Sequence, residues 1–267
     1  LTMERARKLL QHRRLVRAAA ELSSVSEVFE LVEAEGAHMN DVHVILCLLR
    51  LGKLSNSLRR QDRVHSSYKR LLAFTASLAQ RRRLDAEDLG NIMLTVYYLG
   101  GQGSLLKDLL RETSQALLVC IRRGACSPRD LASSAWALAK LRDPHSVLWR
   151  PLTSMAAGMM HEFDVLEATK LAWALGAAGL NCEACDRKLP EVLAREVQGR
   201  WMKDLSARCL SNLLWAFAKL DARRQAAGAA VDAFLEEAAR QVRRLLEEFT
   251  ALELSNVAWA PQPLGRG

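Results

Sequence analysis

The chain has 267 residues, a formal net charge of +8 and a hydrophobic fraction of 50%, with only 14 glycines and 6 prolines. A hydrophobic fraction this high excludes a disordered chain, and the scarcity of glycine and proline argues against a fold rich in β-hairpins. Alanine and leucine, both strong helix formers, dominate the composition. We therefore predict an all-α protein.

The first residues of the chain are strongly basic. Residues 1–20 carry six arginines and lysines and one acid, Glu4. This composition fits either a basic first helix or the remnant of an organelle-targeting presequence. We accordingly divide the chain into this segment at 1–22, a helical-repeat array at 23–260 and a tail at 261–267. Nowhere is there an apolar run of about 18 residues, so we predict no membrane span.

A recurring pattern, Leu-x4-Trp-Ala, indicates internal repeats. The tryptophans that anchor four gapless copies are Trp136, Trp173, Trp215 and Trp259. These anchors are 37, 42 and 44 residues apart. Weaker copies upstream place Leu94 at the anchor position 42 residues before Trp136, and Leu46 a further 48 residues earlier. The chain thus holds about five to six repeats of roughly 37–48 residues.

The start of each copy has a physical explanation. A good helix N-cap stands nine residues before five of the anchors, at Asp85, Ser127, Asp164, Ser206 and Thr250. Acidic residues three positions later complete a capping box in most copies, and an apolar residue precedes each cap. These signals predict that each copy is a helix with a defined first residue.

Amphipathic stretches lie between these capped helices. They fall at 24–35, 66–81, 104–121, 146–160, 188–198 and 226–248. The repeat unit is therefore a pair of helices, and one pair cannot bury its apolar face alone. We predict an α-solenoid of stacked helix pairs. The anchor tryptophans are expected mainly as core between helices, with ligand stacking as the alternative, and a Trp→Ala change in such a core should cost about 3–5 kcal/mol.

The segment 210–220, LSNLLWAFAKL, resembles the second helix of the octotricopeptide-type repeat and of the related heptatricopeptide-type repeats. Residues 131–141 and 254–260 are similar to it as well, and the resemblance covers 85–260 well and 1–84 poorly. The resemblance implies an α-solenoid that acts on RNA in mitochondria or chloroplasts. Many members also carry a RAP domain, which we do not recognise in this sequence, so a nuclease-like role has no support.

Members of these families are transcript-specific maturation or translation factors, or ribosomal RNA-binding subunits. The few and irregularly spaced repeats favour a structural rRNA-binding subunit of a mitochondrial ribosome, with the chloroplast as the alternative location. The expected partners are RNA, either rRNA or an organellar transcript, and neighbouring proteins of a large ribonucleoprotein assembly. A free transcript-specific factor and a protein–protein scaffold without RNA contact are the alternatives.

Two recurring features suggest where RNA binds. First, a polar residue three positions before the anchor and a basic residue four positions after it share one helix face. Second, clusters of basic residues recur near helix ends, and stacking of the repeats would align these clusters into a ridge that binds phosphates. Backbone capping and helix-dipole compensation are the alternative roles for these residues. The candidate RNA-binding residues are Arg50, Asn91, Arg122, Arg123, Ser133, Lys140, Arg142, Lys170, Asn212, Lys219, Arg223 and Arg224.

Catalytic and metal-binding signals are weak. Cys182 and Cys185 form a single C-x2-C pair, whereas a structural zinc site needs four ligands. No glycine-rich loop follows a predicted strand, and neither a nucleophile elbow nor a paired-histidine zinc motif occurs. We expect no enzyme activity, no cofactor and no metal.

Overall fold

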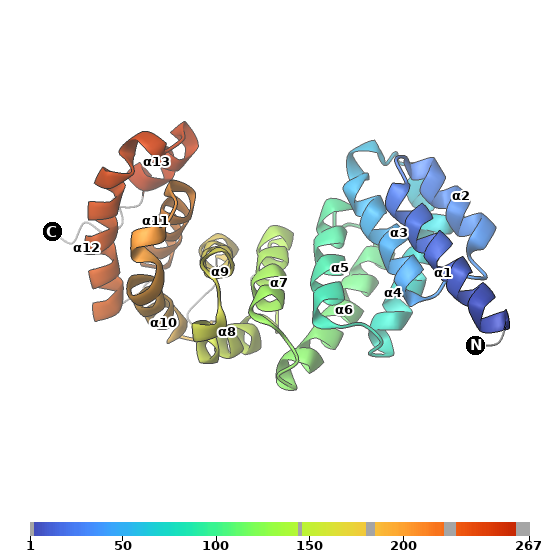
Figure 1. Ribbon diagram of the computed structural model, residues 1–267, viewed down its shortest axis with the longest axis horizontal. Coiled ribbons are helices and arrows are strands. Elements are labelled where there is room, and N and C mark those ends of the chain that lie inside the picture. Colours follow the sequence, from blue (N-terminus) through green and yellow to red (C-terminus); the bar gives the residue numbers. More distant parts are fainter. Residues whose placement is uncertain (1–2, 144–145, 180–184, 222–227, 260–267) are drawn as a thin grey trace. The chain divides into compact units, whose positions relative to one another are not determined.

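The computed structural model describes residues 3–143, 146–179, 185–221 and 228–259 (Figure 1). This described part consists of thirteen α-helices with short 3-10 and π-helical turns and contains no strand. The predicted all-α fold of helix pairs is thus confirmed. The helices group into two compact units, Leu1–Val119 and Cys120–Gly267.

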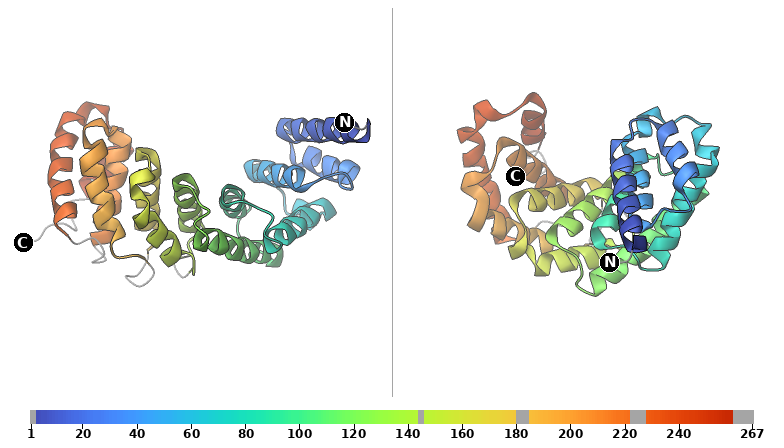
Figure 2. Two further views of the ribbon diagram at one scale, coloured as in Figure 1. Left: turned by 60° about the horizontal axis from the view of Figure 1, so that its bottom comes forward. Right: turned by 45° about the vertical axis from the view of Figure 1, so that its right-hand side comes forward.

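The first unit contains two layers of helices (Figures 1 and 2). Its helices are α1 (Met3–Glu21), α2 (Val25–Glu35), α3 (Asp41–Lys53), α4 (Ser66–Gln80), α5 (Ala86–Tyr98) and most of α6 (Ser104–Arg122). One layer is formed by α1, α3 and α5, which pack side by side, and α2 packs on α4 in the other. The basic segment at the start of the chain is therefore a helix packed on α3, with Leu15 and Ala19 buried.

The second unit repeats this arrangement. Its helices are α7 (Pro128–Leu141), α8 (Trp149–Gly158), α9 (Val165–Ala178), α10 (Leu189–Glu196), α11 (Ala207–Asp221), α12 (Ala229–Arg244) and α13 (Ala251–Trp259). The capped helices α7, α9, α11 and α13 pack in series as one layer, and α8, α10 and α12 form the other. Leucines, alanines and the rings of Phe163, Phe217 and Phe234 fill the core between the layers. In the described part, no helix is both long and apolar enough to cross a bilayer.

The predicted N-caps fix where the second helix of each pair begins. The side chain of Asp85 accepts from the backbone N–H of Asp88 at 2.8 Å. Ser127 and Asp164 form complete capping boxes with the acids three residues later. Ser206 and Thr250 also accept from the third helical N–H. Each cap satisfies backbone donors that the first turn would otherwise leave free.

The anchor of the first copy lies three residues later than the sequence suggested. Asn40 is the N-cap of α3, so the anchor nine residues on is Leu49 rather than Leu46. Helix packing supports this register, because Gly52 lies against Thr95 as Gly176 lies against Ala216. Both glycines stand three residues after an anchor. The spacing from Leu49 to Leu94 is 45 residues rather than 48, and Leu46 takes the position three before the anchor.

Helices α9 and α11 approach closely at Gly176. A methyl group placed there would lie 3.0 Å from the Cα of Ala216 and 3.1 Å from the ring of Trp215. We therefore expect Gly176→Ala to lower the free energy of unfolding by about 1–2 kcal/mol, because overpacking outweighs the better helix propensity of alanine. Gly158→Ala, where a methyl group meets nothing within 4 Å, is the control and should be neutral or slightly stabilising. Urea unfolding of both variants tests this, and an equal response of the two would refute it.

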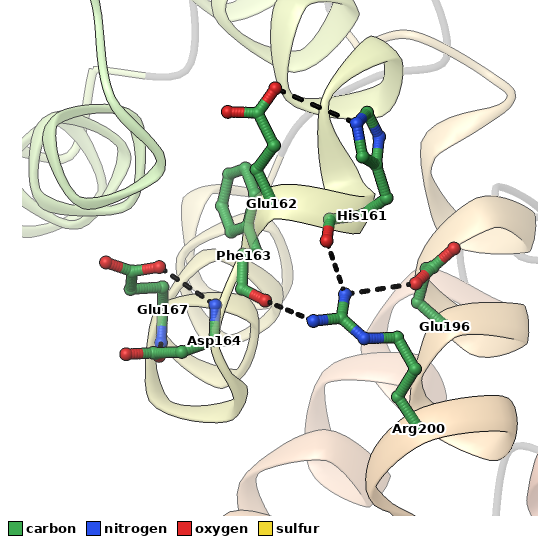
Figure 3. Close-up of polar contacts among 7 residues, drawn as sticks. All are labelled: His161, Glu162, Phe163, Asp164, Glu167, Glu196 and Arg200. Carbon is green, nitrogen blue, oxygen red and sulfur yellow. Dashed lines mark hydrogen bonds and ion pairs between the residues drawn. The ribbon is translucent and has the colours of Figure 1, made fainter.

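Arginines join consecutive repeats through backbone carbonyls. Arg200, after α10, donates to the carbonyls of His161 and Phe163 at 2.8 and 3.2 Å and pairs with Glu196 (Figure 3). These carbonyls lie in the turn just before the Asp164 cap. Arg244 makes the equivalent contact to the carbonyl of Lys203, one repeat further on. The first helix of one repeat thus holds the turn that begins the second helix of the preceding repeat.

A buried histidine ties α1 to α3. The Nδ1 atom of His43 accepts from the backbone N–H of Asn40 at 3.1 Å, and its Nε2 lies 3.2 Å from the carbonyl oxygen of His12. Nε2 therefore carries the proton of a neutral ring. Burial, the largest cause, lowers the pKa of His43 below 6.5.

We expect this histidine to make the first unit less stable in mild acid. Because the folded pKa lies below the unfolded one, the contribution of neutral His43 is complete above pH 6.5 and is lost as the pH falls toward the folded pKa. Urea unfolding monitored by far-UV circular dichroism at pH 7.5 and 5.5 measures the effect. His43→Gln keeps an oxygen that can accept from Asn40 but does not titrate, so the difference between the two pH values should shrink. An unchanged difference would exclude His43 as its source.

Candidate nucleic-acid interface

The anchor-bearing helices of the second unit share a groove of about 880 Å³. It is lined by residues of α7, α9, α11 and α13, together with the N-caps Ser206 and Thr250. Helices α9, α11 and α13 each contribute the residues three and seven positions before the anchor, whereas α7 contributes its anchor Trp136 and Lys140. Positions that are three or four residues apart lie on one face of a helix. The repeat register therefore determines which side chains line the groove.

Three anchor tryptophans on α7, α9 and α11 lie side by side, and we call Trp136, Trp173 and Trp215 the tryptophan row. Trp136 and Trp173 line the groove, and Trp215 packs beside Trp173 without lining it. The ring centroids of Trp136 and Trp173 are 6.4 Å apart, and those of Trp173 and Trp215 are 6.1 Å apart with planes inclined by only 19°. All three side chains are half-buried rather than fully buried. The expectation that the anchors are core is therefore only partly right, because part of each indole remains exposed to solvent.

Lysine ammonium groups lie over these rings. Lys140 Nζ is 5.1 Å from the centroid of Trp136 and 4.8 Å from that of Trp173. Lys170 Nζ is 5.7 Å from the Trp136 centroid and donates to the hydroxyl of Ser133 at 2.8 Å. These distances are within the range of cation–π attraction. Burial, and secondarily the Arg129 guanidinium, lowers the pKa of Lys170 below its ordinary value.

Polar side chains complete the groove. Asn212 and Asn256 each stand three residues before an anchor and present amide groups that can donate and accept. Arg208 adds a third cation to Lys140 and Lys170. The carboxylate of Glu253 accepts from the N–H and hydroxyl of Thr250 as part of a helix cap, which lowers its pKa. The lining is therefore basic overall, with its one carboxylate committed to the cap.

The second helices of the repeats in the first unit form a groove with different side chains. A smaller groove of about 350 Å³ lies over α1, α3 and α5, lined by the anchors Leu49 and Leu94 and by Asn91 and Tyr98. With leucine at the anchors, this groove offers no indole face, and Tyr98 is the aromatic residue in its lining. The two units therefore share a repeat register but differ in the chemistry of their grooves.

The structure brings together about half of the predicted site residues. Ser133, Lys140, Lys170 and Asn212 lie at the groove of the second unit, and Lys219 Nζ lies 5.7 Å from the Trp215 centroid. Asn91 lines the groove of the first unit. Arg50 also lines that groove, but its guanidinium donates to the carbonyl of Leu22, one residue after α1.

The predicted basic clusters lie on two edges of the array rather than on one ridge. Arg122 and Arg123 stand at the C-terminal end of a first helix, α6, whereas Arg142 follows the end of a second helix, α7, and all three are exposed. The two helices of a pair are joined by a short turn and run antiparallel, so their C-terminal ends lie on opposite edges. Arg223 and Arg224 lie outside the described residues.

Sequence reasoning underrated the tryptophans and missed Arg208. Arg208 stands seven residues before its anchor, a position occupied by the exposed Leu166 and Leu252 in the neighbouring copies. The sequence signal for Arg208 was its helical register relative to Trp215. No sequence signal indicates that the tryptophans are partly exposed, because the burial of an anchor side chain depends on how much of it the following helix covers.

The cysteines that the structure describes are not clustered with other metal ligands. Among the described residues, no group of three or more His, Cys, Asp or Glu side chains could hold a metal ion. Cys185 is a buried free thiol, and burial raises its pKa to about 11. Cys182, the other half of the C-x2-C pair, lies outside the described residues.

Comparison of the chain with protein-family models and with curated proteins gives no match.

Proposed function

We propose that this chain is an organellar RNA-binding helical-repeat protein whose second unit holds RNA along the tryptophan row. The observation that carries the proposal is the row itself: three half-buried indoles lie side by side, two of them in the groove, with lysine ammonium groups over their faces. Proteins that bind single strands combine aromatic surfaces for base stacking with cations for the phosphates. Asn212 and Asn256 add hydrogen-bonding groups within reach of base edges.

Within this function, we propose a structural rRNA-binding subunit of a mitochondrial ribosome, with a chloroplast location as the alternative. The support is the resemblance of 85–260 to octotricopeptide-type and heptatricopeptide-type repeats, together with the small number of irregular repeats. Four anchor helices line the groove, so it contacts only a few nucleotides. A free factor that reads a long transcript sequence needs more regular repeats than this.

Filter binding to a short single-stranded RNA across a salt series tests the binding itself. Three basic side chains line the groove, and each phosphate contact to a single strand contributes about −0.7 to the slope of log affinity against log salt, so we expect a slope near −2. An absence of affinity, or an affinity that does not change with salt, would exclude the groove as a phosphate-binding site.

Co-sedimentation tests the proposed assembly. A ribosomal subunit protein should migrate with large particles in a sucrose gradient and leave them after RNase treatment. A free factor should bind RNA without migrating with those particles. Persistence in a small complex after RNase would instead favour a protein scaffold, which the leucine-anchored groove of the first unit also suits.

A further inference from the structure

We propose that Lys140 is a displaceable plug on the tryptophan row, and that it makes the groove select an unpaired, phosphate-bearing strand. The inference rests on the proposed function. It names the form of RNA that the groove takes and the residue that enforces the selection.

The position of Lys140 is the first step. Its ammonium group lies over two indole faces at once, with centroid distances of 5.1 and 4.8 Å. Within the described residues it has no hydrogen-bond or ion-pair partner, so these two rings are what hold it. Lys170 differs, because the Ser133 hydroxyl fixes it in place by a hydrogen bond of 2.8 Å.

The second step is a conflict over the same surface. A base stacks by covering the face of an indole, and Lys140 already lies over the faces of Trp136 and Trp173. A base can therefore stack there only if the ammonium group moves away. The lysine stem has four flexible carbons, so rotation about them clears the rings without moving α7.

The third step is where the displaced charge goes. Leaving the rings costs the cation its attraction to two π-faces. A single strand replaces the lost attraction, because the ammonium group can form an ion pair with a phosphate next to the stacked base. A neutral aromatic molecule offers nothing in exchange. Lys140 therefore opposes neutral ligands and favours anionic ones.

The fourth step concerns strandedness. Within a duplex the faces of every internal base are covered by its neighbours, so only the two end pairs have a free face and no run of bases can cover successive indoles. The tryptophan row offers three neighbouring indoles, two of them in the groove, and stacking along this row requires unpaired bases. A duplex can meet the lysines through its phosphates but cannot displace Lys140 by stacking.

Tryptophan fluorescence is suited to testing this, because all six tryptophans of the chain lie between residues 136 and 259. The probes are adenosine, a ten-nucleotide oligoadenylate and a ten-base-pair RNA duplex. Lys140→Met keeps the apolar stem and removes the charge. Lys188→Met, at an exposed lysine before α10, is the matched control.

We expect opposite effects on the binding of adenosine and of the oligoadenylate. Lys140→Met should bind adenosine about threefold more tightly, because nothing charged then covers the rings, and should bind the oligoadenylate about tenfold more weakly. Lys188→Met should match the wild type on both. The duplex should cause little quenching of any of the three proteins.

Each contrary result would refute a specific part of the proposal. If Lys140→Met leaves adenosine affinity unchanged or lowers it, or if adenosine quenches neither protein, Lys140 is not a plug. If the duplex quenches the wild type as strongly as the oligoadenylate does, the selection for unpaired strands fails. If neither RNA binds the wild type at all, the proposed RNA function fails with it.

Discussion

Replacing Trp173 by alanine is expected to weaken the binding of a short single-stranded RNA by about 10- to 100-fold. Trp173 is the middle of the tryptophan row and neighbours both Trp136 and Trp215, so its removal interrupts both ring pairs. Stacking of a base on an aromatic side chain contributes about 1–3 kcal/mol, which corresponds to this range of affinities. Lys140 also loses one of its two rings in this variant.

The same substitution should affect stability less than affinity. Trp173 is half-buried, so we expect a cost of about 1–3 kcal/mol rather than the larger cost of a fully buried tryptophan. Filter binding at fixed salt, with far-UV circular dichroism to show that the variant is folded, measures both effects. Trp173→Phe keeps an aromatic face and should bind within about threefold of the wild type. Affinity of the folded Trp173→Ala variant within twofold of the wild type would remove the tryptophan row from the binding site.

Much of the fold could be predicted because local signals were strong. The cap residues Ser127 and Asp164 gave the first residue of α7 and α9, since few other side chains can accept the free N–H groups of a first turn. The apolar periodicity of 104–121 and 188–198 located α6 and α10 to within two residues. These features depend on residues close together in sequence.

The first copy shows where such signals fail. Leu46 and Leu49 lie three positions apart on the same helix face, so apolar periodicity alone fits either one as the anchor. The true N-cap, Asn40, is followed three residues later by His43 rather than by an acid. The structure shows the correct register in the Asn40 cap and in the contact between Gly52 and Thr95, two residues from neighbouring helices.

The candidate site was harder to predict than the fold for the same reason. In the sequence, Arg200 and Arg244 look like any other arginines of this basic protein. In the structure, each donates to a backbone carbonyl about 40 residues away and so joins two consecutive repeats. Lys140 and Lys170 were expected to face a ligand, but their contact with indoles of neighbouring helices depends on how the pairs stack. Residue type and helical phase identified the face, whereas the pairing of charge with aromatic surface required the tertiary structure.

The largest effect on stability is expected at Trp149, a tryptophan outside the repeat signature. Its side chain is 0% exposed in α8, and its Nε1 donates to the carbonyl of Asp143 at 2.8 Å. Trp149→Ala removes this ring from a closed core and leaves the carbonyl without its donor. We expect a loss of about 3–5 kcal/mol in the free energy of unfolding.

The Trp149 and Trp173 variants together separate packing from binding. Trp149→Phe refills most of the space and should recover all but about 1–2 kcal/mol, the part due to the hydrogen bond and the remaining volume. Urea unfolding followed by circular dichroism measures these losses. At temperatures where Trp149→Phe is folded, its RNA affinity should equal that of the wild type, since the ring does not line the groove. A loss of affinity as large as that of Trp173→Ala would mean that the groove depends on the first-helix layer, and that the exposed indole faces alone do not account for binding.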